Sequence, residues 1–280
     1  MQKSIRRYFA LFALPTILVF AVIFIIPFIL GVYLSFTEFR TVTDASWIGL
    51  GNYIKAFSNQ DFINALWFTV KFTVVSVITI NVLAFLLAVL LTRGARGTDV
   101  FRTVFFMPNL IGGIVLGYIW LLILNGILMK FDVTLTFSAT YGFWGLVILM
   151  NWQLIGYMMI IYIAGIQNVS KEVIEAAQID GSTRFGILRN VTIPLVMPSI
   201  TICLFLTLSN SFKLFDQNLA LTAGAPSKET SMLALDIYNT FYGSVGWEGV
   251  GQAKAVVFFV LVALIALIQL AATRSKEVES

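Results

Sequence analysis

Long apolar runs separated by shorter polar segments make up most of the chain. A helix that crosses a membrane needs roughly 20 mostly apolar residues, and six runs reach that length. The predicted spans are about Phe9–Phe36, Phe62–Thr92, Thr103–Leu124, Trp144–Gln167, Pro194–Phe215 and Ala255–Thr273. The pattern predicts an all-α integral membrane protein with six transmembrane helices in a single domain, residues 1–280.

The first run follows three basic residues, Lys3, Arg6 and Arg7, as the apolar core of a signal peptide would. Its charge-free stretch, Tyr8–Thr37, is far longer than the roughly 7–15 residues of a signal core. We therefore expect an uncleaved first span.

A polar segment between the fourth and fifth runs, residues 168–193, carries helix signals of its own. Ser170 is predicted to cap a short helix, with Glu172 in its first turn near the positive end of the helix dipole. Asp180 and Gly181 are predicted to end that helix, with Gly181 at positive φ, and Ser182 is predicted to cap a second helix. Two short helices that meet at a glycine form a compact projection, suited to fit a socket on another protein.

Composition supports a lipid environment. The mean hydropathy is +0.92 and only 11% of residues are charged, whereas a soluble domain carries about a quarter. The single cysteine, Cys203, lies inside an apolar run, so neither an intrachain disulfide nor redox chemistry is predicted. A net charge of +4 would suggest nucleic acid in a soluble protein. Here it reflects basic residues gathered on one side of the membrane, and no nucleic-acid partner is expected.

The basic residues set the expected orientation, because short cytoplasmic segments are enriched in Lys and Arg. With the N-terminus inside, eleven of the eighteen basic residues fall in short cytoplasmic segments. They are Lys3, Arg6, Arg7, Arg93, Arg96, Arg102, Lys171, Arg184, Arg189, Arg274 and Lys276. The other seven, spread over longer outer loops, are Arg40, Lys55, Lys71, Lys130, Lys213, Lys228 and Lys254. This asymmetry predicts that both termini and residues 168–193 lie in the cytoplasm.

Several kinds of chemistry lack the residues that they need. The sequence has no Gly-x-x-x-x-Gly-Lys-Ser/Thr phosphate loop, no histidine and no cysteine pair. Asp61 and Asp216 fall at the outer ends of spans, whereas proton-coupled transporters usually keep ionisable groups at mid-membrane. We therefore expect no catalytic residue, no metal site and no bound cofactor in this chain. A sodium site built from backbone carbonyls stays open as an alternative.

Uncharged polar and aromatic residues occur within the fourth and fifth spans. The candidate substrate-pathway residues are Asn151, Trp152, Tyr157, Thr207, Asn210, Ser211 and Phe212. Thr207, Asn210 and Ser211 share one helix face at i, i+3 and i+4. Amides and hydroxyls beside aromatic rings suit an uncharged polyhydroxylated ligand, whose C–H surfaces pack on the rings. The alternative is interhelical hydrogen bonding, worth about 0.6 kcal/mol per pair.

Two outer segments, Trp47–Tyr53 and Thr222–Pro226, combine aromatic or apolar residues with turn residues. Such segments can rest on the membrane surface and meet an external partner. An aromatic belt with ordinary turns explains them equally well.

The polar segment resembles the EAA loop of the permease subunits of binding-protein-dependent ABC importers. The matching pattern is Glu175-Ala176-Ala177, three residues, Gly181, nine residues and then Val191-Thr192-Ile193-Pro194. Asp180 and Pro198 agree as well. The likeness covers nearly the whole chain and points to the MalF/UgpA-like branch of sugar permeases. Further matching segments are Phe105-Phe106-Met107-Pro108 and Ser211-Phe212-Lys213-Leu214-Phe215-Asp216.

This resemblance implies a type I importer permease fold, similar to MetI, in a bacterial or archaeal cell (inner) membrane. The implied protein partners are a second permease subunit, two ATPase subunits and an extracytoplasmic sugar-binding protein. The chain would also contact the lipid bilayer. ATP and magnesium would bind only in the ATPase subunits. The residues implied to couple the chain to an ATPase subunit are Glu175, Ala176, Ala177, Asp180, Gly181, Phe185 and Pro194.

The expected function is that of a non-catalytic transmembrane subunit of an ATP-driven carbohydrate importer. An importer of another polar solute, such as glycerol phosphate, uses the same scaffold and stays open. A stand-alone secondary carrier is the alternative from another class, and transport by the purified chain without ATP would distinguish it. A membrane-embedded enzyme has no reactive residues to support it.

Overall fold

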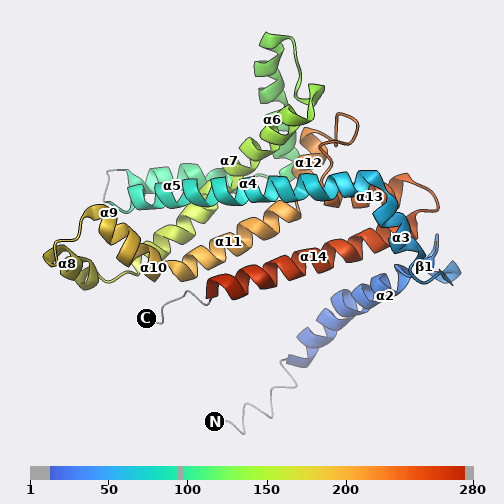
Figure 1. Ribbon diagram of the computed structural model, residues 1–280, viewed down its shortest axis with the longest axis horizontal. Coiled ribbons are helices and arrows are strands. Elements are labelled where there is room, and N and C mark those ends of the chain that lie inside the picture. Colours follow the sequence, from blue (N-terminus) through green and yellow to red (C-terminus); the bar gives the residue numbers. More distant parts are fainter. Residues whose placement is uncertain (1–12, 94–96, 275–280) are drawn as a thin grey trace, which may run out of the picture. The chain divides into compact units, whose positions relative to one another are not determined.

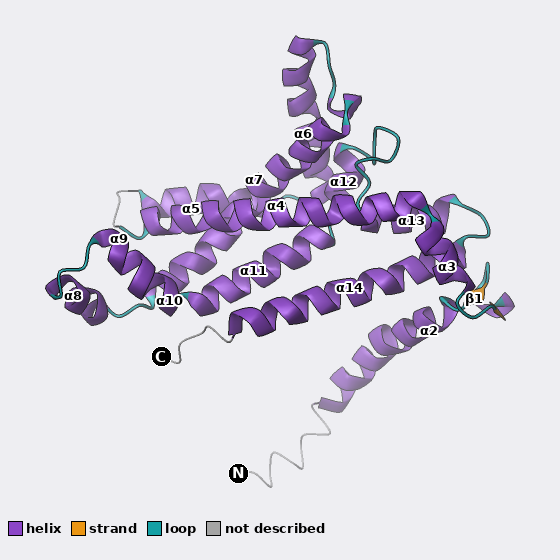
Figure 2. Ribbon diagram, in the orientation of Figure 1, coloured by secondary structure: helices purple, strands orange, loops and turns teal. Residues whose placement is uncertain are grey.

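The computed structural model describes residues 13–93 and 97–274, which are mostly helical (Figure 1, Figure 2). The predicted all-α membrane class is confirmed. The chain divides into two compact units. The single permease domain stays a prediction. The first unit contains the described parts of Met1–Gln60 and Ile237–Phe259, and the second those of Asp61–Asp236 and Val260–Ser280. Outside the described residues lie positions 9–12 of the first predicted span and Lys3, Arg6, Arg7, Arg96 and Lys276.

The first unit begins with a long apolar helix followed by a small hairpin. Its elements are the helix Ala13–Leu34, which contains the π-helical η1 (Ala21–Ile25) and α2 (Ile26–Leu34), then β1 (Thr37–Glu38), η2 (Val42–Asp44), β2 (Ser46–Trp47) and α3 (Gly51–Ser58). β1 and β2 pair antiparallel, with Thr37 opposite Trp47. The buried amide of Asn52 donates to the carbonyls of Ser35 and Thr37 at 3.0 and 2.7 Å. These two bonds hold α3 to the hairpin and give the outer segment around Trp47 a defined structure.

The second unit is a helical bundle around α7. Its elements are α4 (Gln60–Leu91), α5 (Thr98–Phe106), η3 (Met107–Leu110), α6 (Gly113–Leu128), η4 (Met129–Phe131), η5 (Leu135–Phe137), α7 (Ala139–Gln167), α8 (Lys171–Ile179), α9 (Arg184–Ile187), η6 (Leu188–Thr192), α10 (Ile193–Leu195), α11 (Met197–Phe212) and α12 (Asp216–Leu221). α13 (Leu233–Gly243) and α14 (Glu248–Arg274) each contribute residues to both units. Figure 1 shows α5 and α11 beside α7, and both contact it.

The core of this unit combines large side chains of α7 with small side chains of α4. Leu149, Met158 and Met159 of α7 are fully buried, as are Ala84 and Ala88 of α4. Small residues let two helix backbones approach closely, which is how helices associate in a membrane, where water does not drive their packing. α7 is therefore a central span, against which both candidate sites described below are built.

Five helices in the described part of the chain are long and apolar enough to cross a membrane, and a bent pair makes a sixth. The five are Ala13–Leu34, Gln60–Leu91, Gly113–Phe131, Ala139–Gln167 and Glu248–Thr273. The bent pair consists of Arg184–Leu195 and Met197–Phe212, which meet at 70°.

The third and fifth predicted spans differ from the observed helices. The run Thr103–Leu124 is interrupted, because Pro108 lies in the 3-10 turn η3 and Gly112 is extended, with φ −60° and ψ 141°. α6 therefore starts only at Gly113. The run Pro194–Phe215 is bent at Val196, between two prolines whose missing N–H groups weaken the helix ladder.

The segment Thr222–Pro226, which the sequence predicts to lie on the outer side, is held by one buried amide. Asn218 donates to Thr222 Oγ1 and to the carbonyl of Thr230, at 2.9 and 2.8 Å. Nearby, Lys228 pairs with Asp61 at 2.8 Å, and the hydrogen bond to this carboxylate raises the pKa of Lys228. Both predicted outer segments thus have a defined structure.

Candidate coupling loop and solute cavity

The first helix of the EAA loop is set at both ends by local hydrogen bonds, as the sequence predicts. α8 begins after Ser170, whose Oγ accepts a backbone N–H of the first turn at 3.4 Å. At the other end, Gly181 lies at φ +78° and donates to the carbonyl of Gln178, and Ser182 donates to that of Ala177, both at 3.0 Å. These two bonds form a Schellman motif, whose left-handed position favours glycine. The predicted cap and the positive φ of Gly181 are confirmed.

The second helix of the loop begins one residue later than predicted. Ser182 is the predicted cap, but α9 starts after Thr183, whose Oγ1 accepts the N–H of Gly186 at 3.1 Å. The N–H of Ser182 already closes the Schellman motif. Thr183 is the next extended residue, with φ −70° and ψ 160°, and it takes the capping role.

The coupling candidates lie mostly on the outer surface of this helix pair. Glu175, Ala176, Asp180, Gly181 and Phe185 are exposed, whereas Ala177 and Pro194 are half-buried. Ile179, which the sequence analysis missed, is 87% exposed, and Phe185 is 70% exposed. Two large apolar side chains on a charged projection indicate a surface that another protein covers. The sequence could have indicated Ile179 as an exposed residue, because it lies directly before Asp180, where the helix was predicted to end.

The EAA loop is continuous with the fifth span. α9, η6 and α10 follow one another without a break, and Val196 joins α10 to α11 across the 70° bend. α11 has 16 residues, which at 1.5 Å per residue is about 24 Å of helix. Only Val196 separates the loop helices from this long helix, which carries Asn210 near its far end.

A cavity of about 260 Å³ lies at that far end, between α7, α11 and α12. The residues that line it are Asn109, Met150, Gln153, Leu154, Tyr157, Asn210, Lys213, Leu214 and Gln217. Gln217 Nε2 donates to Gln153 Oε1 at 2.8 Å, which joins α12 to α7 across the cavity. Four amides, one phenol and one ammonium thus surround a floor of methionine and leucine. Such a wall can hydrogen-bond hydroxyl groups while an aromatic ring covers apolar surface.

Glycines allow the helices around the cavity to pack closely against one another. A Cβ built on Gly156 of α7 would lie 1.8 Å from the carbonyl oxygen of Phe105, so the backbone of α5 crosses α7 at this point. In α6, a Cβ on Gly117 would lie 2.6 Å from the Cβ of Ala220 in α12. The same helix has Gly113 one turn earlier, so the pair forms the Gly-x-x-x-Gly pattern of closely packed membrane helices. These contacts fix Asn109, after α5, and α12 around the cavity.

Tyr157 and Asn210 are the two candidate pathway residues that line this cavity. The Tyr157 ring packs against Phe106, with ring centroids 6.3 Å apart. Asn210 donates to the carbonyl of Leu206 at 2.8 Å, which leaves its side-chain oxygen available within the described part of the chain.

The structure places the other five pathway candidates elsewhere. Asn151 donates to Thr79 Oγ1, and Thr207 Oγ1 accepts from Asn81 Nδ2, both at 2.9 Å, so each joins its helix to α4. Ser211 and Phe212 are buried, and Trp152 packs edge-on against Trp120.

Gln153, a polar residue of the fourth span, lines the cavity but was not among the candidate pathway residues. Met150, Gln153, Leu154 and Tyr157 stand at i, i+3, i+4 and i+7, so they share one face of α7. Asn151 falls on another face, and this spacing was readable from the sequence. Asn109, Lys213 and Gln217 were missed because they lie at or beyond helix ends that only the structure reveals.

A multi-pass helical bundle with an EAA loop and a polar cavity beside its central span defines a membrane transport permease. Residues 87–276 match the family described as the binding-protein-dependent transport system inner membrane component, and the chain belongs to this family. No group of three or more His, Cys, Asp or Glu side chains suited to a metal ion occurs among the residues described.

Comparison with individual proteins agrees with this assignment. The chain is 45% identical to the probable starch degradation products transport system permease protein AmyD of Thermoanaerobacterium thermosulfurigenes, over 97% of this chain and 96% of the relative. It is 28% identical to the trehalose/maltose transport system permease protein MalF of Thermococcus litoralis, over 90% and 88%. The fold matches a chain of a bacterial ABC transporter involved in the import of alginate, an acidic polysaccharide. That match has a TM-score of 0.82 over 98% of each chain, at 21% identity.

Proposed function

We propose that this chain is the transmembrane subunit of an ATP-driven carbohydrate importer. The observation that carries the proposal is the cavity beside α7, where Asn109, Gln153, Asn210 and Gln217 supply amides and Tyr157 supplies a ring. Amides donate and accept, so they can bond both sides of a sugar hydroxyl. The family and the sugars named in AmyD and MalF support the same class of solute.

The proposed complex contains a second permease, two ATPase subunits and an extracytoplasmic sugar-binding protein. This chain itself holds no catalytic residue and no cofactor, and ATP and magnesium bind in the ATPase subunits. The exposed side chains of Ile179 and Phe185 enter a cleft of one ATPase subunit, with Glu175 and Asp180 at the rim. Central apolar anchors surrounded by charges are the common pattern of protein interfaces.

Closure of the ATPase pair would act on the cavity through the fifth span. The EAA loop runs directly into α11 across the bend at Val196, and α11 carries Asn210. The cavity volume of about 260 Å³ is below the roughly 300–1,000 Å³ of typical ligand pockets. We therefore assign it as one wall of the pathway, which the second permease completes.

Lys213 favours one alternative solute. Its ammonium group lines the cavity and supplies a cation that a phosphorylated or acidic ligand requires. An importer of glycerol phosphate would need this charge, whereas an importer of a neutral sugar would not. Lys213→Gln in the complete transporter should leave the uptake of a neutral oligosaccharide within about twofold, because an amide still bonds hydroxyls. Loss of uptake for anionic solutes alone would favour the alternative.

The cavity assignment predicts a contrast between two asparagines. Asn210→Ala removes an amide from the cavity and should raise the KM for sugar uptake about tenfold, the effect of one lost hydrogen bond to a ligand, about 1.4 kcal/mol. Asn151→Ala is the matched control, because its amide joins α7 to α4 instead. It should lower stability by about 0.6 kcal/mol with an unchanged KM. An unchanged KM in Asn210→Ala, with retained ATPase binding, would place the sugar site elsewhere.

The proposed topology has both termini and the EAA loop in the cytoplasm. Cysteine substitutions at the exposed Lys55 and Glu229 should react with an impermeant maleimide added to intact cells, whereas one at the exposed Ser182 should react only after permeabilisation. The native Cys203 is fully buried and provides the unreactive background. Labelling of Ser182→Cys in intact cells would reverse the orientation.

A further inference from the structure

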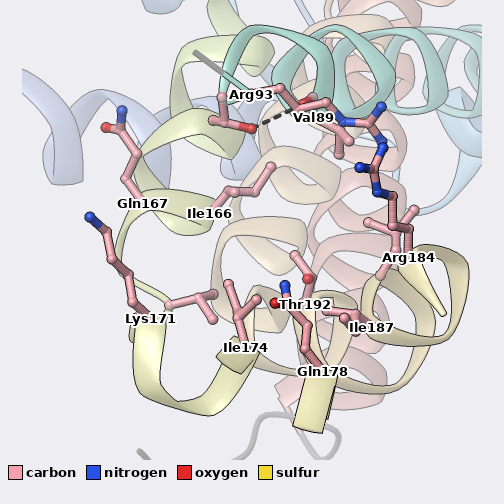
Figure 3. Close-up of a pocket in the computed structure, with 13 residues that line it drawn as sticks. Val89, Arg93, Ile166, Gln167, Lys171, Ile174, Gln178, Arg184, Ile187 and Thr192 are labelled. Carbon is pink, nitrogen blue, oxygen red and sulfur yellow. Dashed lines mark hydrogen bonds between the residues drawn. The ribbon is translucent and has the colours of Figure 1, made fainter. Parts of the chain in front are cut away.

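A cavity of about 650 Å³ lies behind the EAA loop, inside the second unit (Figure 3). Its walls come from the last turns of α4 and α7 and from α8, α9 and η6. α4 ends at Leu91 and α7 at Gln167. Both helices are candidate membrane spans, so the cavity lies at the level where a bilayer meets water.

The charges around this cavity all have the same sign. Arg93, Lys171 and Arg184 line it, and none of the described lining residues is Asp or Glu. Within the described residues, none of these three cations has an ion-pair or hydrogen-bond partner for its side chain. Figure 3 shows the side chains of Arg93 and Arg184 pointing toward one another. Both residues are exposed, so water and salt screen their mutual repulsion, and an anion bound between them would offset it further.

The carboxylates of the loop are kept apart from this cavity. Glu172, Glu175 and Asp180 are exposed on the same short helix or at its end, yet none of them lines the cavity. Both the acidic and the basic groups are exposed to solvent, but only the basic ones line the cavity. Between the basic groups, Ile166, Ile174 and Ile187 form an apolar wall (Figure 3).

We infer that this cavity binds a phosphate-bearing anion, with Arg93 and Arg184 as its direct ligands and Lys171 as a further positive charge. The guanidinium fork matches the geometry of phosphate oxygens and forms charge-assisted hydrogen bonds with them. Basic pockets between the ends of membrane helices are suited to lipid head groups. An anionic phospholipid and a soluble phosphate share this chemistry, and the apolar wall favours the lipid.

Binding of an anionic phospholipid at this site would make the position of the EAA loop depend on the lipid composition of the membrane. Arg93 follows α4 and Arg184 is the first residue of α9, so an anion held by both joins the end of a span to the second helix of the loop. Lys171, the first residue of α8, lies on the other side of the cavity (Figure 3). The inference does not depend on which solute the importer carries.

The test uses the purified full-length chain in an uncharged detergent. Binding of phosphatidylglycerol with a fluorescent acyl chain is measured by anisotropy, and phosphatidylcholine with the same acyl chain is the control probe. The wild type should bind phosphatidylglycerol at least tenfold more tightly. The double variant Arg93→Gln/Arg184→Gln should lose this preference. Arg189→Gln is the matched control, because Arg189 is exposed on η6 and does not line the cavity; it should keep the preference.

Competition by inorganic phosphate separates the two sources of the anion. Displacement of the lipid by phosphate at millimolar concentration would assign the site to a soluble phosphate, and resistance to displacement would assign it to the lipid. Equal binding of the two lipids together with no effect of phosphate would overturn the inference, as would a preference that survives in the double variant. If the double variant aggregates, each single variant should still lose the preference at least threefold, with an unchanged melting temperature.

Discussion

Gly156→Ala should prevent normal folding of the second unit and abolish transport. The added Cβ would lie 1.8 Å from the carbonyl oxygen of Phe105, 2.2 Å from its carbonyl carbon and 2.7 Å from the backbone nitrogen of Phe106. These are backbone atoms, so no side chain can rotate away, and α5 must move off α7. We expect a destabilisation of about 3 kcal/mol or more, at the upper end of overpacking effects. Melting of the solubilised full chain and sugar uptake in cells measure the two losses.

Gly126→Ala provides the control for this change. Gly126 also lies inside a helix, α6, but a Cβ built on it has no neighbour within 4 Å. Alanine there should be neutral or should stabilise the helix by up to about 1 kcal/mol. A wild-type melting temperature and normal uptake in Gly156→Ala would show that α5 does not pack on α7 in the membrane as described.

Gly181→Val should uncouple the permease from its ATPase while the membrane bundle stays folded. Nothing lies within 4 Å of a Cβ at this position, so the cost comes from the backbone, at φ +78°. A β-branched residue is a strong outlier there, and relaxing it re-aims α9 and with it Phe185. We expect at least a tenfold loss in both sugar uptake and co-purification of the ATPase, with the melting temperature changed only slightly.

Gly181→Asn distinguishes the effect of backbone strain from the effect of adding a side chain at the same position. Asparagine accepts the left-handed region more readily than other side chains, so it should retain most of the uptake and ATPase binding. Loss in both variants would mean that the interface has no room for a side chain here, which also places Gly181 at the ATPase. Normal uptake and normal ATPase retention in Gly181→Val would remove the coupling role.

The EAA loop could be predicted from the sequence because its structure is local. Ser170 caps a helix through a bond to its own first turn, and Gly181 ends that helix through bonds to residues three to five positions away. Interactions of this range depend on residue type and spacing, which the sequence displays directly. One local prediction was wrong, since Thr183 and not Ser182 caps the second helix. Both residues carry a hydroxyl group that can cap a helix, but the backbone N–H of Ser182 belongs to the Schellman motif, so the second helix begins after Thr183.

The solute cavity could be predicted only in part. The spans and their polar residues follow from hydropathy, yet α4, α7 and α11 are apolar around most of their circumference, and their composition does not show which face is buried. Asn151 has the same residue type as Asn210, and Thr207 shares a helix face with it. Hydrogen bonds to Thr79 and Asn81 nevertheless join Asn151 and Thr207 to α4 and not to the cavity.

The sequence by itself determined the membrane class, the number of long apolar runs and the form of the EAA loop, because length, hydropathy and capping act over one helix at a time. The tertiary structure decided the break before α6, the bend at Val196, the crossing at Gly156 and the membership of both cavities. The break and the bend follow from Pro108, Gly112 and the prolines on either side of Val196, which continuous apolar runs concealed. The crossing and the cavities depend on contacts between helices far apart in the chain. An apolar helix could bury any of several faces at nearly the same energy, and its contacts with other helices decide which face is buried.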